Sequence, residues 1–132
     1  MILRQVEDGG LSTYIRRWTN SYTRYFNTKH DRVGPLFQGP YKVVRIASDE
    51  LLLHTTRYVH LNQVAAGLLT IEQLVESPWS SYQNYCLGRS SWCTSKMLIE
   101  LAGGRERYVE FVRDQADYAR ELDRIKHLAL ER

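Results

Sequence analysis

The sequence predicts an α+β protein that is mostly helical, with two short strands in its first half. Apolar residues recur at three- and four-residue steps from residue 11 to residue 26, the spacing of an amphipathic helix that ends near His30. A helix-start signal at residues 48–50, followed by three leucines, indicates a second helix. β-Branched and aromatic residues are enriched in residues 2–6 and 41–47, which favours two strands that pair with each other. Beyond residue 68, short apolar stretches separated by glycine, serine and proline indicate further helices.

The first predicted strand, residues 2–6, ends in the turn formed by residues 7–10. A helix then runs to about His30, and residues 31–35 form a loop that Gly34-Pro35 interrupts. The second strand, residues 41–47, follows. The apolar stripe of the first helix consists of Leu11, Ile15, Trp18, Tyr22 and Tyr25 or Phe26.

The second long helix is predicted from about Asp49 to Asn62 or Val64. Ser48-Asp49-Glu50 is a helix-start signal, and Gly67 supplies the glycine expected beyond a helix end. Within this helix, Tyr58 and Asn62 lie one turn apart on the same face. That spacing alone also fits an ordinary amphipathic helix with a half-buried tyrosine.

The remaining chain is predicted as helices over residues 71–76, 79–87, 94–102 and 105–130. Ser77-Pro78, Gly88 and Gly103-Gly104 separate them. The segment Trp-Ser-Ser-Tyr at residues 79–82 indicates a helix start, with Ser80 or Ser81 as its cap.

Length and composition indicate one domain with an ordinary globular balance. The chain has 132 residues, of which 43% are hydrophobic and 25% charged, and no apolar run is long enough to span a bilayer. No secretory signal is recognisable at the N-terminus, so we expect a cytoplasmic protein with no membrane partner. Cys86 and Cys93 are then expected to be reduced thiols.

Positive charge is concentrated in residues 11–62, which hold eight basic residues against three acidic ones. A polyanion such as nucleic acid is a suitable partner for such a surface. Aromatic rings interleaved with cations along residues 14–29 resemble a surface for single-stranded DNA, although the same rings could form a core stripe beneath a basic face. The candidate DNA-binding residues are Arg16, Arg17, Arg24, Lys29, Lys42, Arg45 and Arg57.

The four histidines do not form a recognisable metal motif. His54 and His60 are six residues apart, so on one helix they point in different directions. Neither these two nor His30 and His127 have a zinc-site spacing, and each is interpreted as structural or solvent-exposed.

Several landmarks occur together and in order. They are RQVEDGG at residues 4–10, YTRYFN at 22–27, GPLFQG at 34–39 with Tyr41-Lys42 after it, RYVHLN at 57–62, AGL at 66–68 and WSSY at 79–82. In this order they resemble the single-tyrosine HUH transposases, in particular the REP-associated branch. The segment from Trp92 through residues 107–112 resembles the C-terminal part of that branch.

The resemblance implies DNA strand cleavage and rejoining next to small hairpins in single-stranded DNA, through a 5′-phosphotyrosine intermediate. Tyr58 matches the nucleophile, and Asn62 matches a side chain that completes a Mg²⁺ or Mn²⁺ site. The implied fold is the second half of a ferredoxin-like core in residues 1–68. Residues 69–132 would then be a helical extension packed on the same domain.

Departures from the family pattern favour a second interpretation. The family's histidine pair would precede residue 2, so the chain is expected to be an N-terminally shortened form that lacks it. Gln63, Ala65 and Pro40 stand where the family usually has proline, arginine and a basic residue. The chain could therefore be a catalytically inactive DNA-binding protein or an inert oligomeric remnant, and an incomplete core would favour a homodimer.

Overall fold

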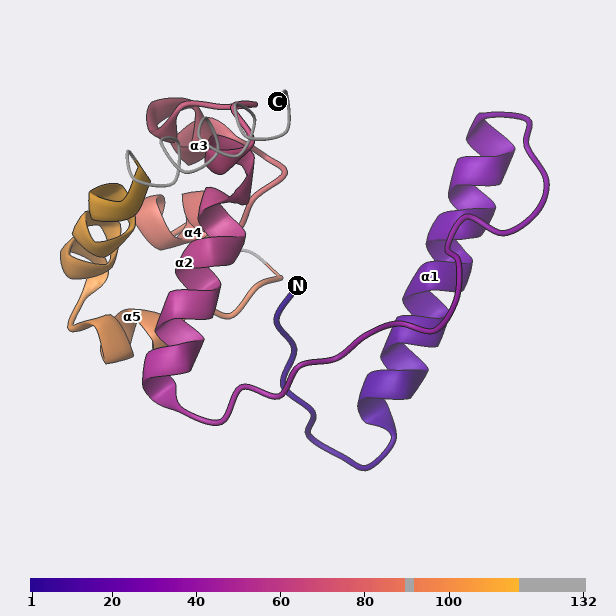
Figure 1. Cartoon of the computed structure of the whole chain (residues 1–132), viewed down its shortest axis with the longest axis horizontal. Coiled ribbons are helices and arrows are strands. Elements are labelled where there is room, and N and C mark those ends of the chain that lie inside the picture. The colour runs from indigo at the N-terminus through magenta and orange to yellow at the C-terminus, as the bar shows by residue number, and fades with distance from the viewer. Residues whose placement is uncertain (90–91, 117–132) are drawn as a thin grey trace, which may run out of the picture. The chain divides into compact units, whose positions relative to one another are not determined.

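A computed structural model describes residues 1–89 and 92–116 of the chain. Figure 1 shows the helices, and a further helical segment runs over residues 105–116. The named helices are α1 (Gly10–Lys29), α2 (Asp49–Ala65), α3 (Ile71–Glu76), α4 (Tyr82–Leu87) and α5 (Lys96–Ala102).

The chain divides into two compact units, Met1–Arg45 and Ile46–Arg132. Unit 1 contains α1, and unit 2 contains α2 to α5 and the segment 105–116. The helix that carries Tyr58 therefore groups with the C-terminal helices, and α2 contacts both α3 and α5.

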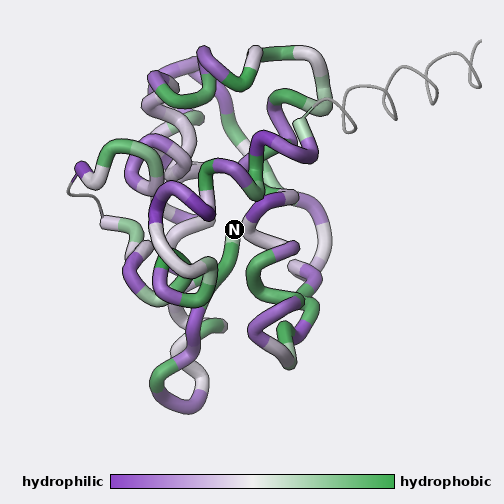
Figure 2. The backbone as a smooth tube through the Cα atoms, turned by 90° about the vertical axis from the view of Figure 1, so that its left-hand side faces the viewer, coloured by the Kyte–Doolittle hydropathy of each residue, from purple (hydrophilic) through white to green (hydrophobic). Residues whose placement is uncertain are grey.

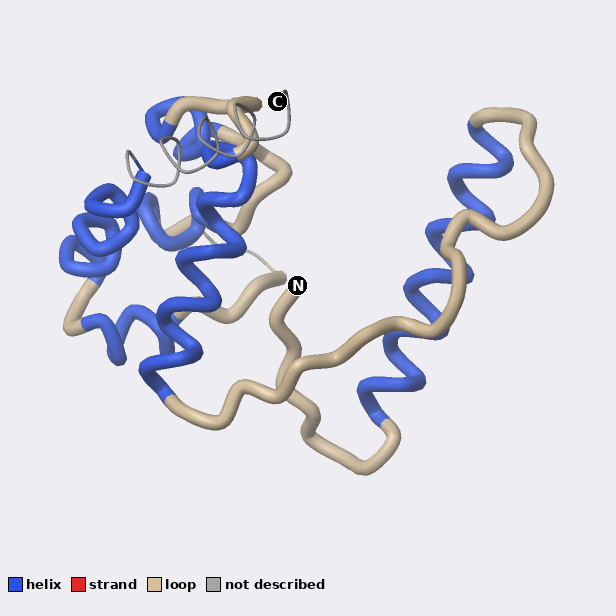
Figure 3. Tube along the Cα trace, viewed as in Figure 1, coloured by secondary structure: helices blue, strands red, loops and turns tan. Residues whose placement is uncertain are grey.

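The two predicted strands are not formed, so the expectation of half a ferredoxin-like sheet is wrong. Figure 3 shows the segments 2–6 and 41–47 as loop, and the described part of the chain contains no strand. Their side chains lie largely in solvent, with Val6 at 92% and Val44 at 85% exposure. Two short strands that pair only with each other are at best marginally stable in water, because no third strand or helix covers a face of the pair.

The helix α1 confirms the amphipathic pattern predicted for residues 11–30. It begins after Gly9, which has a left-handed φ of 74°, and it buries no side chain. The predicted aromatic stripe is exposed rather than packed in a core: Trp18 and Tyr22 stack at 5.9 Å between ring centroids and Phe37 contacts both rings.

The ends of α2 and α3 follow the sequence signals closely. The Ser48 side chain accepts a hydrogen bond from the amide of Leu51, and Gly67 has a left-handed φ of 70° just beyond the end of α2. In α3, Thr70 and Gln73 form a reciprocal capping box. The predicted bounds of α3 are confirmed.

The next helices are shorter than predicted. α4 begins at Tyr82 rather than at residue 79, and α5 begins at Lys96 rather than at residue 94. The last predicted helix is observed over residues 105–116, and its remainder to residue 130 lies outside the described residues. At the end of α4, Gly88 has a left-handed φ of 65°, and a Cβ there would lie 3.0 Å from the guanidinium of Arg105.

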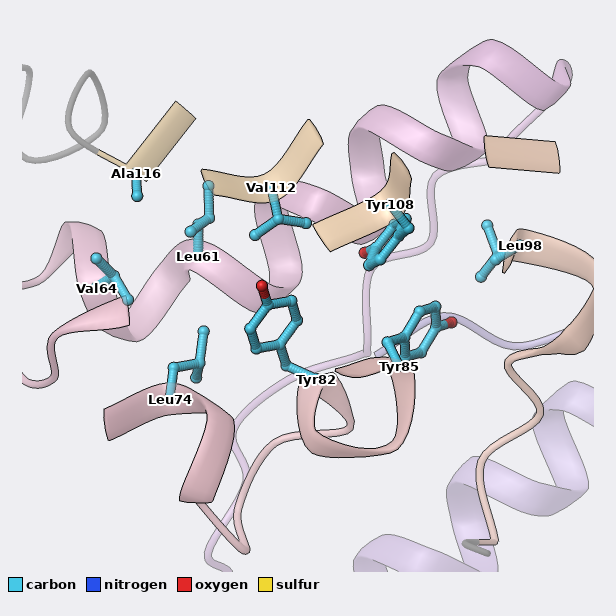
Figure 4. Close-up of a cluster of buried hydrophobic side chains, with 9 residues drawn as sticks. All are labelled: Leu61, Val64, Leu74, Tyr82, Tyr85, Leu98, Tyr108, Val112 and Ala116. Carbon is cyan, nitrogen blue, oxygen red and sulfur yellow. The ribbon is translucent and has the colours of Figure 1, made fainter. Parts of the chain in front are cut away.

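The hydrophobic core lies wholly in unit 2. Figure 4 shows its side chains converging from α2, α3, α4, α5 and residues 105–116, with Tyr82 and Tyr85 of α4 lying across from Tyr108 and Val112. Tyr82, Tyr108, Leu74, Val64 and Val112 are its largest fully buried side chains. Since the core as a whole draws side chains from four named helices and the segment 105–116, it determines which face of each helix is turned to solvent.

No helix among the described residues is both long and apolar enough to cross a membrane. Figure 2 shows hydrophobic and hydrophilic positions interleaved along the coloured part of the backbone. Among the described residues Cys86 and Cys93 form no disulfide, and each is partly buried.

Candidate functional site

Tyr58 and Asn62 lie on the exposed face of α2. Tyr58 is 71% exposed, and Asn62, one turn later, is also exposed. The two side chains share a face, as the four-residue spacing predicts, and the structure turns this face to solvent.

The opposite face of α2 is held in the core. Thr56, His60, Leu61 and Val64 are its buried residues. A helix residue turns about 100° from its neighbour, so His60 lies about 200° from both Tyr58 and Asn62. Burial of His60 therefore directs both candidate site residues outward.

His60 lies at the centre of a buried polar cluster. Its Nδ1 is 2.7 Å from the hydroxyl of Tyr108, and its Nε2 is 2.8 Å from Oγ of Ser81. The Tyr85 ring meets the imidazole edge-on at 4.7 Å between centroids. Burial lowers the pKa of His60 to about 4, so the ring is neutral at pH 7. The prediction of a structural histidine fits this position.

Burial also sets the ionisation of the tyrosines around His60. It raises the pKa of Tyr85 to about 12, with a smaller contribution from Cys93, and it raises the pKa of Tyr108 further. Both phenols are therefore neutral at physiological pH and can act as hydrogen-bond donors.

Arg57 contacts the helical segment 105–116 and does not face solvent freely. Its guanidinium lies 3.9 Å from the ring centroid of Phe111 and donates to the Phe111 carbonyl at 3.2 Å. It also bonds Nδ1 of His54 at 2.9 Å. Desolvation by burial lowers the pKa of Arg57. This predicted DNA contact is thus occupied in holding two helices together.

The other predicted cations lie in unit 1 and are exposed. Arg16, Arg17, Arg24 and Lys29 lie on α1, whereas Lys42 and Arg45 lie in the segment that forms no strand. The start of this segment is tied to α1, because the hydroxyl of Tyr41 is 2.8 Å from Oγ of Ser12.

Two shallow depressions run along one side of α1. One, of about 640 Å³, is lined by residues that include Arg24, Tyr25 and Lys29. The other, of about 580 Å³, is lined by residues that include Arg17 and Trp18. Ser21 lines both, so together they form a continuous strip of hydroxyls, guanidinium groups and ring edges, with the carboxylates of Glu7 and Asp8 beside the start of α1.

The arginines of α1 lie at different angles around the helix axis, and so at different distances from the aromatic stripe. Arg17 and Arg24 are seven residues apart, so they lie on nearly the same side of the helix, about 10 Å apart along its axis. Each is about 100° to 120° around the helix from Trp18, while Arg16 is about 160° away. Arg17 and Arg24 therefore border the aromatic stripe, and Arg16 lies on the far side.

The predicted metal ligand has no complete set of partners among the described residues. Those residues contain no group of three or more His, Cys, Asp or Glu side chains that could hold an ion. Along α2, Glu50, His54, Tyr58 and Asn62 follow at four-residue intervals, and Glu50 lies 3.9 Å from His54. Glu50 and Asn62 are about 18 Å apart along the axis and cannot meet at one ion. The donors in the described residues do not fit a Mg²⁺ or Mn²⁺ site.

Sequence reasoning missed the contacts of Arg57 and the partners of His60. The four-residue repeat that ends at Asn62 was a visible signal that His54 shares a side of α2 with Tyr58. No comparable signal joined His60 to Ser81 and Tyr108, which are 21 and 48 residues away.

Comparison with protein-family models, curated proteins and solved structures found no match to this chain.

Proposed function

We propose that the chain is a transposase-type protein that binds single-stranded hairpin DNA and presents Tyr58 as a nucleophile. The observation that carries the proposal is the exposed phenol of Tyr58 on a helix whose other face is anchored in the core. The ordered landmarks around residues 57–62 support the same function by resemblance.

The strip along α1 supports the DNA-binding part of the proposal. Tyr14, Trp18 and Tyr25 expose ring surface on which bases can stack, and Arg17 and Arg24 lie beside them at a suitable position for phosphates. Stacking on rings tolerates any base sequence, whereas paired bases offer no free faces. A single strand is therefore the form of DNA that fits this surface.

The chemical step is a transesterification at phosphorus. The phenol oxygen of Tyr58 forms a bond to the phosphorus atom as the bond from phosphorus to the sugar 3′-oxygen breaks. The phenolic proton is lost, and the departing 3′-oxygen gains a proton to become a hydroxyl. The covalent product retains the energy of the phosphodiester for rejoining.

A second candidate function is binding of hairpin DNA without cleavage. The donors around Asn62 favour it, because the described residues contain no group of three or more His, Cys, Asp or Glu side chains that could hold an ion beside Tyr58. A homodimer stays a prediction in either case.

A covalent-adduct experiment decides between the two functions. The protein is incubated with hairpin-bearing single-stranded DNA and Mn²⁺, and the mixture is run on a denaturing gel. We expect an adduct that disappears in Tyr58→Phe and persists in Tyr41→Phe, which removes the hydroxyl of an exposed tyrosine outside the strip along α1. Binding with no adduct would establish the second function, and an adduct that persists in Tyr58→Phe would contradict the role of Tyr58.

DNA affinity tests the strip itself. We expect Arg17→Ala/Arg24→Ala to weaken hairpin binding about tenfold at moderate salt and to reduce the slope of log affinity against log salt by about 0.7 for each lost contact. Arg16→Ala removes one positive charge from the far side of α1, and its loss of affinity should be smaller than the loss per charge in the double variant. An equal loss of affinity for each charge removed would show that only the net charge of α1 matters.

A further inference from the structure

His60, Ser81 and Tyr108 join three separate helical segments through one buried imidazole. His60 is only 2% exposed and lies in α2, Ser81 immediately precedes α4, and Tyr108 lies in the segment 105–116. Both ring nitrogens are used, at 2.7 Å to Tyr108 and 2.8 Å to Ser81.

The chemistry of the two partners suits a neutral imidazole. A neutral histidine has one N–H donor and one acceptor nitrogen, and a hydroxyl can serve either role. In one tautomer Tyr108 donates and Ser81 accepts; in the other the directions are reversed. Both ring nitrogens thus have a hydrogen-bond partner, and neither partner is charged. The two hydrogen bonds also fix the orientation of the ring.

This arrangement explains the segment Trp-Ser-Ser-Tyr at residues 79–82. Ser81 occupies the N-cap position of α4, but its side chain makes no cap bond there. Ser80 instead accepts a bond from the amide of Tyr82 at 3.2 Å. The hydroxyl of Ser81 is directed to His60, so the two serines have different structural roles.

We propose that His60 is a positioning residue that sets the rotation of α2 about its axis and thereby the direction of Tyr58. His60 is two residues from Tyr58 and two from Asn62, on the opposite side of the helix. Rotation of α2 would break at least one of the two bonds to His60 and leave a buried polar group unpaired. The link to catalysis rests on the function proposed above, whereas the link to helix position does not.

The test removes the two partner hydroxyls and leaves His60 in place. Ser81→Ala and Tyr108→Phe each delete one hydroxyl, and Tyr108→Phe retains the buried ring. Tyr85→Phe is the matched control. It removes a phenolic hydroxyl that is not bonded to His60, from a ring that packs against His60 in the same cluster.

Amide hydrogen exchange gives a measurement that is independent of activity. In the Ser81→Ala/Tyr108→Phe variant we expect exchange at residues 58–62 to accelerate about tenfold relative to exchange in α3, with no such local change in Tyr85→Phe. Equal acceleration in α2 and α3 would show a global loss of stability only, and it would overturn the proposal. Unchanged exchange in α2 would overturn it as well.

Single-turnover adduct formation with hairpin DNA and Mn²⁺ gives the functional measurement. We expect the rate per folded molecule to fall at least tenfold in the double variant while the dissociation constant for DNA stays within twofold, since a displacement of about 1 Å can cost about a hundredfold in rate. His60→Gln, which can donate and accept, should retain more of the rate than His60→Ala.

The outcomes separate this proposal from the function proposed above. If the wild-type protein forms no adduct, the catalytic function fails, and hydrogen exchange alone decides whether His60 positions α2. If the wild-type protein forms an adduct and the double variant reacts at the same rate, the positioning role is overturned while the catalytic function stands.

Discussion

At the scale of single residues, burial gives His60 and Arg57 roles that differ from their usual ones. His60 is a titratable group with no charged partner in its cluster, and its pKa is lowered to about 4 by desolvation. Arg57 is a cation that stacks on Phe111 and bonds a backbone carbonyl. The contribution of His60 to stability therefore depends on its protonation, and the contribution of Arg57 depends on its contacts with Phe111.

His60 makes stability depend on pH. The unfolded chain binds a proton near the ordinary pKa of 6.5, while the folded chain binds it only near pH 4, so stability is full above 6.5 and falls as the pH drops from 6.5 to 4. The expected loss is about 3 kcal/mol. Urea titrations at several pH values measure it.

The control for this pH dependence is His60→Gln, which has no titratable ring. Its stability should fall less steeply over the same interval, because the proton that a buried His60 ring excludes in the folded chain is no longer bound on unfolding. Parallel loss in the two proteins would show that His60 is not the responsible group.

At the scale of elements, caps decide the ends of the helices and pairing decides whether strands exist. Thr70 and Gln73 satisfy each other's backbone amides at the start of α3. The segments 2–6 and 41–47 have suitable residues for strands, but the described part of the chain provides no neighbouring strand for either. A helix satisfies its hydrogen bonds within its own segment, and a strand does not.

The contribution of the Thr70 cap to stability can be measured against Ser95, a residue at the start of α5 whose side chain makes no cap bond. We expect Thr70→Ala to lower the free energy of unfolding by about 1 kcal/mol, because it removes a bond to the amide of Gln73. Ser95 precedes α5 and makes no side-chain cap bond, so Ser95→Ala should change stability by less than about 0.5 kcal/mol. Equal effects in urea denaturation would contradict the assigned role of Thr70.

At the scale of the whole molecule, the two units differ in how they are stabilised. The buried core residues lie between Leu61 and Ala116, whereas the longest helix of the described chain, α1, buries none of its side chains. Hydrophobic burial is the main favourable term in folding, so unit 2 should account for the cooperative stability of the chain.

A fragment spanning residues 46–132 tests this division. We expect it to unfold cooperatively, with a midpoint within about 5 °C of the full chain, a shift that corresponds to about 1 kcal/mol. A peptide of residues 1–45 should show only partial helix by circular dichroism, since an isolated helix is marginal in water. Loss of the cooperative transition in the larger fragment would show that unit 1 stabilises the core.

The sequence predicted the helices well because their signals are local. Leu11, Ile15 and Trp18 show the period of α1, and Ser48 and Thr70 mark two helix starts within a few residues of the bonds they make. Tyr58 and Asn62 could be placed on one face for the same reason. The prediction of two strands was wrong because a strand also needs a neighbouring segment to pair with, and residue type alone does not show whether the fold provides one.

By itself, then, the sequence determined where α2 and α3 begin, where positive charge collects and which two residues of α2 share a face. Only the tertiary structure decided that this face is exposed, that Arg57 is held against Phe111 and that His60 joins Ser81 to Tyr108. The physical reason is that exposure, desolvation and hydrogen-bond satisfaction are set by neighbours in space. For His60 these neighbours lie 21 and 48 residues away along the chain.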